Sequence, residues 1–151
     1  MATAAQIQLA KVFITNRFGY SIQDLGLVAE AMDTTGFYRA GSNKRLAIVG
    51  DAALKIAIAA AWYPTGAPRG EYSVYSSHVS NINLATVARL IELGQHLILN
   101  PGHFGAVSSN TLATGLEAFF GAIYQDCGGD ISIVSAAMTA VGIKLPGTDD
   151  N

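Results

Sequence analysis

Residues 43–52 read Asn43-Lys44-Arg45-Leu46-Ala47-Ile48-Val49-Gly50-Asp51-Ala52, and residues 112–118 read Leu112-Ala113-Thr114-Gly115-Leu116-Glu117-Ala118. These two stretches decide the fold. In each of them apolar residues recur at the spacing of a helix, and each carries a single carboxylate among small and apolar neighbours. The two stretches therefore predict two helices, one with Asp51 on it and the other with Glu117.

The composition indicates one globular domain. Half of the 151 residues are apolar and 13% are charged, so the chain can bury about two thirds of its unfolded surface. We place the domain at residues 1–145 and a flexible tail at 146–151. Asp51 and Lys55 interrupt the most apolar run, so we expect no membrane partner. The N-terminus lacks a signal-peptide pattern and Cys127 has no disulfide partner in the chain, so an intracellular location is expected, with the compartment left open.

The charge balance does not favour autonomous binding to nucleic acid. Nine basic residues stand against eleven acidic ones, for a net charge of -2. Binding to RNA or DNA depends largely on pairing phosphates with Lys and Arg. The sequence has no Lys or Arg between Arg89 and Lys144, and its one tight basic cluster is Arg39, Lys44 and Arg45. Strong RNA binding by this domain alone is therefore not expected, and no DNA partner is expected.

Helical periodicity dominates the chain, and no segment alternates as a strand does. Ser21 is the expected N-cap of the second helix, with Asp24 at the third position of a capping box. Pro64 should end the helix that Asn43 begins, and Gly94 should end the next one. The expected helices cover residues 4–16, 21–32, 43–63, 71–93, 109–126 and 130–141.

Segments spread along the chain, in the family's order and at nearly its spacing, resemble the ribonuclease III family. Residues 43–52 are similar to its signature (N/H)-E-R-L-E-F-L-G-D-S/A, and residues 112–118 to its partner motif L-A-D-x-x-E-A. Residues 18–24 are similar to L-G-Y-x-F-x-D, residues 97–102 to L-I-L-G-P-G, and residues 121–128 to G-A-I-Y-L-D-S-G. Residues 70–71 and 79–85 are similar to the two ends of G-E-L-x-x-L-R-x-x-L-V-S-N-x-x-L-A. The resemblance implies the all-α endonuclease-domain fold of ribonuclease III over nearly the whole chain. We expect no double-stranded-RNA-binding module, because the sequence ends where one would begin.

The resemblance also implies a site, which is only half retained. In the family, two acids on each of two helices bind divalent metal ions that hydrolyse double-stranded RNA. The four positions are Ala47, Asp51, Thr114 and Glu117 in this sequence. Ala47 has no ligand atom and Thr114 has only a neutral hydroxyl, so Asp51 and Glu117 remain as catalytic and metal-binding candidates. They could hold one Mg²⁺ or Mn²⁺ weakly. Alternatively, both serve the structure alone, through bonds to neighbouring helix groups or to Lys44 and Arg45.

Other family positions have lost charge as well. Lys44 stands where the family has an acid, and Ser76 stands where it has an arginine. A further family acid is Ser109 here, and the basic, glycine-rich loop before the partner helix has become residues 105–109, which carry no basic side chain. Phosphates of a substrate would therefore find fewer partners.

The resemblance implies a two-fold dimer in which the signature helix packs against its mate. The family's aromatic plug, which fills a cavity of the partner, corresponds to Ile48 here. Residues 56–62, including Ile56 and Trp62, are apolar almost all round, which is typical of a helix buried on most sides. We expect an isologous homodimer through Ile48, Ile56 and Trp62. The alternative is a helix central to a monomeric core.

Three functions stay open on these grounds. The favoured hypothesis is a pseudoenzyme that serves as an interaction or structural module in RNA processing or an RNA–protein assembly. The second is a weak or redirected metal-dependent endoribonuclease for double-stranded RNA that uses Asp51 and Glu117. The third is a non-catalytic RNA-binding module that uses Arg39, Lys44 and Arg45.

Overall fold

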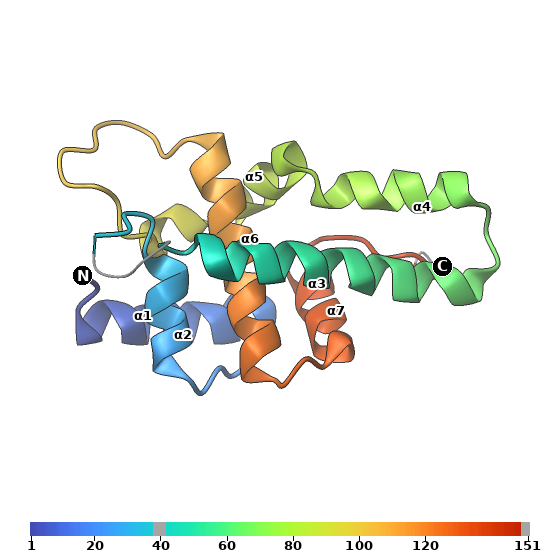
Figure 1. Cartoon of the computed structure of the whole chain (residues 1–151), viewed down its shortest axis with the longest axis horizontal. Helices are drawn as coiled ribbons and strands as arrows, with labels where there is room; N and C mark the ends of the chain where they lie inside the picture. Colours follow the sequence, from blue (N-terminus) through green and yellow to red (C-terminus); the bar gives the residue numbers. More distant parts are fainter. Residues whose placement is uncertain (38–41, 149–151) are drawn as a thin grey trace.

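Seven α-helices make up the part of the chain that the computed structural model describes, residues 1–37 and 42–148 (Figure 1). This confirms the expected all-α class, and these residues form no strand beyond an isolated parallel bridge between Asp33 and Ile98. The helices are α1 (Ala4–Phe18), α2 (Leu25–Met32), α3 (Lys44–Trp62), α4 (Arg69–Ser76), α5 (Asn81–Leu90), α6 (Ser109–Asp126) and α7 (Ile131–Ala140). Short 3₁₀ turns cover Tyr63–Thr65, Ser77–Val79 and Leu93–His96.

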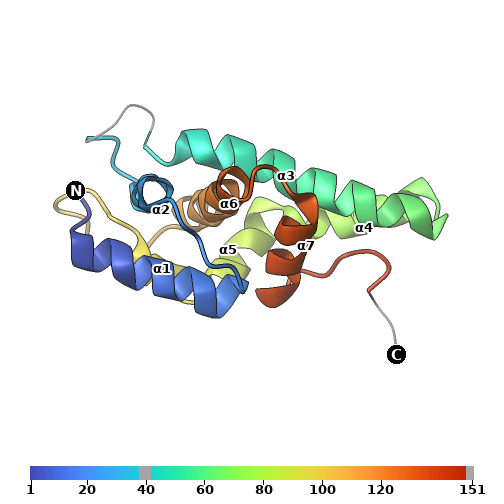
Figure 2. The same ribbon diagram turned by 90° about the horizontal axis from the view of Figure 1, so that it is seen from below.

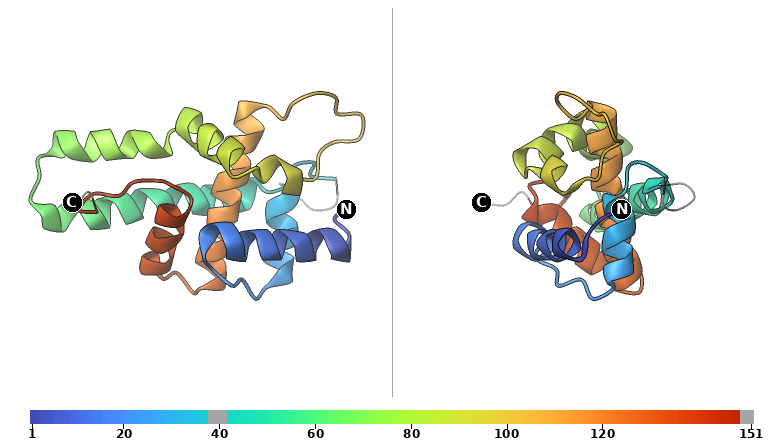
Figure 3. Two further views of the ribbon diagram at one scale, coloured as in Figure 1. Left: turned by 180° about the vertical axis from the view of Figure 1, so that it is seen from behind. Right: turned by 90° about the vertical axis from the view of Figure 1, so that its left-hand side faces the viewer.

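The central helix of the fold is α6, and α2, α3, α5 and α7 all pack against it (Figures 1 and 3). Ser108 begins it as an N-cap, because its side chain accepts a hydrogen bond from the amide of Thr111 at 3.2 Å. The helix is buried along most of its length. It therefore provides a rigid base for any side chain that it shares with α3.

The contact between α3 and α6 is made backbone to backbone. A Cβ added to Gly50 of α3 would lie 1.7 Å from the carbonyl oxygen of Glu117, and one added to Gly121 of α6 would lie 2.1 Å from that of Leu46. No side chain fits at either distance. Both glycines are thus required for the crossing, which places Asp51, the neighbour of Gly50, against Glu117.

Helix α1 lies on the opposite side of α6 from α3 (Figure 2), and an aromatic cluster joins α1 to α6 there. Phe18 of α1 meets Phe120 edge to face at a centroid distance of 5.3 Å, and Phe13 meets Phe119 in the same way at 6.1 Å. Phe18, Phe119 and Phe120 are fully buried. Buried aromatic rings bring large apolar areas out of water, so this cluster is a main source of stability.

Asp126, at the end of α6, organises the connection between α1 and α2. Its carboxylate accepts hydrogen bonds from the Tyr20 hydroxyl at 2.6 Å and from the amides of Gln23 at 3.1 Å and Asp24 at 2.8 Å. Burial and the bond to Asp126 raise the pKa of Tyr20 well above its usual value. Burial opposes ionisation of Asp126, but the three hydrogen bonds outweigh it and lower the pKa of that carboxyl.

The expectation of an N-cap at Ser21 is wrong for this reason. Residues 21–23 are not helical, and Asp126 accepts from the amides of Gln23 and Asp24, which an N-cap at Ser21 would need. Asp24 is the true N-cap of α2, and its side chain accepts from the amides of Gly26 at 2.9 Å and Leu27 at 3.3 Å.

The single helix expected over residues 71–93 is also wrong. Ser80 has an extended backbone, with φ -65° and ψ 158°, and caps α5 by accepting from the amide of Asn83. The Asn83 side-chain amide bonds to the His78 carbonyl oxygen, which closes the turn between α4 and α5. Since α5 ends at Leu90, Gly94 lies in the following 3₁₀ turn and is not a C-cap.

Helix α4 runs back beside the second half of α3, and the pair extends away from the other helices (Figure 3). The Trp62 and Tyr72 rings meet edge to face at 5.5 Å and join the two helices. Within α4 only Tyr75 is buried. Helix α4 is therefore attached to the rest of the domain by few buried side chains.

The stretch Lys44–Thr65 has the length and composition of a membrane-spanning helix, with a mean hydropathy of 1.5, although Asp51 and Lys55 lie within it. About 39% of its most apolar window is buried inside the protein. The buried positions of α3 pack within the core, so its apolar character is partly that of a core helix. Length and composition alone are weak support for a membrane span.

Candidate functional site

The two carboxylates that the sequence singled out come together at the crossing of α3 and α6. Asp51 follows Gly50 on α3, and the carbonyl oxygen of Glu117 on α6 lies against Gly50. The two side chains share a hydrogen bond. Both are only partly exposed. Asp51 and Glu117 therefore lie together at the crossing, and their catalytic and metal-binding role stays a prediction.

Lys55 is the third charged group of this site. Its Nζ lies 3.0 Å from Oδ2 of Asp51, one helical turn away. The Lys55 ammonium also attracts the Glu117 carboxylate. The alternative that Asp51 pairs with Lys44 or Arg45 is thus replaced by a pair with Lys55. Its four-residue spacing from Asp51, typical of ion pairs along a helix, would have indicated this contact in the sequence.

Burial is the main cause of an unusual proton affinity at Glu117. It acts together with the hydrogen bond to Asp51 and the repulsion from that carboxylate, and these effects raise the pKa of Glu117 to about 7. Lys55 opposes the shift. The hydrogen bond to Asp51 raises the pKa of Lys55 in turn. Glu117 therefore gains and loses a proton near neutral pH, and the pair holds less negative charge than two ordinary carboxylates would.

The two other family positions lie one turn before each acid. Ala47 is buried on α3, and Thr114 is partly buried on α6. The methyl group of Ala47 cannot bind a cation, and the Thr114 hydroxyl is a neutral oxygen. Between them they add no negative charge to the site.

Two of the three basic residues predicted to bind RNA can be placed. Lys44 and Arg45 are exposed on the first turn of α3. Arg39 lies outside the described residues. The role of these three residues stays a prediction.

The predicted dimer residues differ in their surroundings. Ile48 is 73% exposed and Ile56 is 51% exposed, whereas Trp62 is half-buried against Tyr72 and donates its indole N–H to the Pro68 carbonyl oxygen at 3.4 Å. Within a single chain α3 is thus buried on one face only, and not on most sides as its composition suggested. The exposed face of α3 leaves room for a second copy of the chain, and the dimer stays a prediction.

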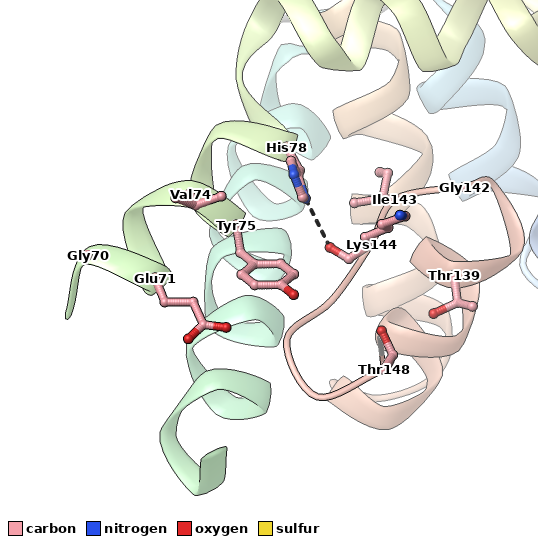
Figure 4. A pocket seen from close by; sticks show the side chains of 10 residues that line it. All are labelled: Gly70, Glu71, Val74, Tyr75, His78, Thr139, Gly142, Ile143, Lys144 and Thr148. Atoms are coloured by element: carbon pink, nitrogen blue, oxygen red, sulfur yellow. Dashed lines mark hydrogen bonds between the residues drawn. The ribbon is translucent and has the colours of Figure 1, made fainter. Parts of the chain in front are cut away.

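A separate cavity lies between α4 and residues 139–148 (Figure 4). It measures about 1050 Å³, and Nδ1 of His78 donates a hydrogen bond across it to the carbonyl oxygen of Lys144 at 3.3 Å. The residues that line it are Gly70, Glu71, Val74, Tyr75, His78, Thr139, Gly142, Ile143, Lys144 and Thr148. No predicted site residue is among them. Glu71 and Tyr75 lie one turn apart on α4, and His78 follows in the 3₁₀ turn Ser77–Val79.

Residues 44–128 match the profile of the Ribonuclease III domain family. The chain belongs to this family. The match begins at the signature helix α3 and ends two residues after α6, so it contains both acids and both glycines of the crossing. The fold and the resemblance expected from the sequence are confirmed.

Among relatives of this ribonuclease III domain is Ribonuclease 3 of Symbiobacterium thermophilum, 32% identical over 127 residues, which cover 78% of this chain and 54% of the relative. Ribonuclease 3 of Marinomonas is 35% identical over 124 residues, with the same coverage of 78% and 54%. Ribonuclease 3 of Corynebacterium diphtheriae is 38% identical over 97 residues, 60% of this chain and 39% of the relative. The chain thus spans about half the length of these relatives, or less.

Solved structures of the nuclease domain of ribonuclease III from Campylobacter jejuni share the fold. One superposes with a TM-score of 0.69 at 20% identity and covers 85% of this chain and 94% of that one. A second has a TM-score of 0.67 at 20% identity and covers 93% and 95%. At this identity the likeness concerns the architecture of the ribonuclease III domain alone.

Proposed function

We propose that this ribonuclease III domain is catalytically inactive and serves as a dimeric structural module in RNA processing or in an RNA–protein assembly. One observation carries the proposal. Each of the two crossing helices contributes a single carboxylate to the site, and the carboxylate of α3, Asp51, is paired with Lys55 at 3.0 Å.

The donor set does not fit a pair of divalent cations. Hydrolysis of a phosphodiester by two metal ions needs several carboxylates around cations about 4 Å apart. Asp51 and Glu117 are the acids at the crossing, and residues 1–37 and 42–148 contain no group of three or more His, Cys, Asp or Glu side chains that could hold a metal ion. Because the Glu117 pKa is raised to about 7, even this pair is partly neutral at physiological pH.

Cleavage of a long double-stranded RNA in Mn²⁺ tests this inactivity. We expect the wild-type protein to leave the RNA intact while Ribonuclease 3 of C. diphtheriae, run in parallel, degrades it. Cleavage by the wild type that disappears in both Asp51→Asn and Glu117→Gln would overturn the proposal. Cleavage that persists in both variants comes from a contaminating nuclease, and further purification should then remove it.

The rival function is a weak metal-dependent endoribonuclease that acts on double-stranded RNA. The contact between Asp51 and Glu117 favours it, since acids from two helices still converge as hydrolysis requires. Two carboxylates and water can bind one Mg²⁺ or Mn²⁺. The same assay separates the two functions, because the rival requires activity that both acids support.

The dimer is supported by the free face of α3. Ile48 and Ile56 are exposed there two helical turns apart, beside the exposed Ala52 and Ala60. One solved structure of the C. jejuni nuclease domain concerns structural flexibility in a region involved in dimer formation of that domain. An apolar helix face repeated on two copies forms an isologous interface.

Analytical ultracentrifugation tests the dimer. We expect a wild-type dimer at micromolar concentration and a monomer for Ile48→Lys. The matched control is Leu90→Lys, which adds the same charge at a residue of α5 that is 75% exposed, and this variant should stay dimeric. A monomeric wild type, or equal dissociation of both variants, would contradict an interface on α3.

A non-catalytic RNA-binding role remains for the exposed Lys44 and Arg45. It predicts an RNA affinity that falls steeply with salt and weakens in Lys44→Ala and Arg45→Ala. An affinity that does not change with salt would exclude it.

A further inference from the structure

The geometry points to Lys55 as the built-in counter-ion of the acids at this crossing: its ammonium pairs with the Asp51 carboxylate, which a divalent cation would otherwise need as a ligand. The inference rests on the proposed function, since it explains how the acids persist in a site without paired metal ions. It assigns a role to a residue outside the two family motifs.

Lys55 reaches the site because of its register on α3. Ala47, Asp51 and Lys55 follow one another at intervals of four residues, so they form one stripe on the helix. Asp51 lies in the middle of this stripe and shares a hydrogen bond with Glu117 of α6. From one turn further along, the Lys55 Nζ reaches Oδ2 of Asp51 at 3.0 Å.

A cation is needed here because part of the site is buried. Glu117 is half-buried between packed helices, and an ionised carboxylate in such a place requires a compensating charge. The attraction of Lys55 to both Asp51 and Glu117 supplies it. With Lys55 in place, the three side chains together carry at most one net negative charge.

A divalent ion would have to compete with this ammonium. To bind Asp51 it would displace a charge-assisted hydrogen bond, and it would also be repelled by the ammonium that it displaced. Removal of the Lys55 charge should therefore uncover a divalent-cation site, even though only two carboxylates are present.

Titration calorimetry with Mn²⁺ tests the inference on the full chain at pH 8. Lys55→Met keeps the length of the side chain and removes its charge. We expect this variant to bind Mn²⁺ at least about tenfold more tightly than the wild type, because the competing cation is gone. Lys55→Arg restores a cation and should bind as weakly as the wild type.

Two further variants locate the effect. Arg45→Met removes one positive charge from a different face of the same helix, and it should change the Mn²⁺ affinity by less than about twofold. The double variant Lys55→Met with Asp51→Asn should lose the affinity that Lys55→Met gained. Circular dichroism melts identify a variant that fails to fold, and Lys55→Gln then replaces Lys55→Met.

The inference is overturned if folded Lys55→Met binds Mn²⁺ no more tightly than the wild type, or if Arg45→Met gains as much affinity. The proposed function fails on a different observation, the cleavage of double-stranded RNA by the wild type. If the wild type leaves RNA intact and Lys55→Met gains no Mn²⁺ affinity, the counter-ion role of Lys55 is refuted and the proposed function is not.

Discussion

Gly50 and Gly121 face each other where α3 crosses α6, and neither position has room for a methyl group, because its Cβ would lie against the backbone of the other helix. A Cβ on Gly50 would lie 2.9 Å from the amide nitrogen of Gly121, and one on Gly121 would lie 3.1 Å from that of Gly50. The same crossing brings Asp51 to Glu117. The contact that stabilises the fold therefore also determines the geometry of the site.

Gly50→Ala should destabilise the protein by about 3 kcal/mol, because the new methyl group forces α3 away from α6. Gly70→Ala is the control, since nothing lies within 4 Å of a Cβ there, and it should change stability by less than about 1 kcal/mol. Urea denaturation gives both free energies of unfolding. Equal effects would show that the crossing has room for a side chain.

Glu117→Gln should stabilise the protein at alkaline pH. The folded-state pKa of about 7 lies above the ordinary value of 4.5, so the folded state holds more protons between these values and loses stability as the pH rises through them. Gln carries no such charge. Since the side chain is half exposed, we expect a gain of only about 1 kcal/mol at pH 8 and little change at pH 4.

Glu71→Gln is the control for this measurement, because Glu71 is an exposed acid on α4. The free energy of unfolding of this variant should follow the wild type at both pH values. A Glu117→Gln variant that is less stable than the wild type at pH 8 would mean that the ionised carboxylate stabilises the fold.

Asp126→Ala should cost about 2 kcal/mol near neutral pH, because the Tyr20 hydroxyl and two backbone amides lose their acceptor. Tyr20→Phe removes one of the three bonds and should cost about half as much. The pKa of Asp126 is lowered from 3.8, so its contribution is present above that value and is lost as the pH falls through the folded-state pKa. The difference between wild type and Asp126→Ala should therefore shrink in acid, as thermal melts from pH 7 to pH 2 can show.

Backbone amides of α4 should exchange with deuterium faster than those of α6. Only Tyr75 of α4 is buried, whereas α6 is buried along most of its length, and segments with few buried contacts open most readily. Tyr72→Ala removes the ring that meets Trp62 and should speed exchange in α4 but not in α6. Equal protection of both helices would indicate that α4 unfolds only with the whole domain.

Local signals predicted the helices that carry the site. The expected helix over residues 109–126 has the observed bounds of α6, because Ser108 caps its start and two glycines follow its end. Helix α3 begins at Lys44, one residue after its predicted start at Asn43, although the Asn43 side chain makes no capping hydrogen bond. Where the errors occurred, polar side chains competed for backbone groups. Ser80 and Asn83 divide the predicted helix over residues 71–93, and Asp126 keeps Ser21 from starting α2.

Only those residues of the candidate site that lie in the family motifs could be predicted from the sequence. The resemblance predicted that Asp51 and Glu117 converge, since both lie in the segments similar to the family's two motifs. Lys55 lies outside those patterns, although its spacing from Asp51 would have revealed it. The cavity beside α4 could not be predicted, because it forms between α4 and a segment about 70 residues later that no local pattern relates to it.

Asp126 binds the amides of Gln23 and Asp24 across 103 and 102 positions of the chain. A ribosome makes the N-terminal residues long before it reaches this aspartate, so the turn between the first two helices has no acceptor during most of translation. The nascent chain can form separate helices by itself, but it can close this turn only after the last third of the domain has emerged. A stalled or prematurely ended translation product would therefore present an open N-terminus to chaperones and proteases.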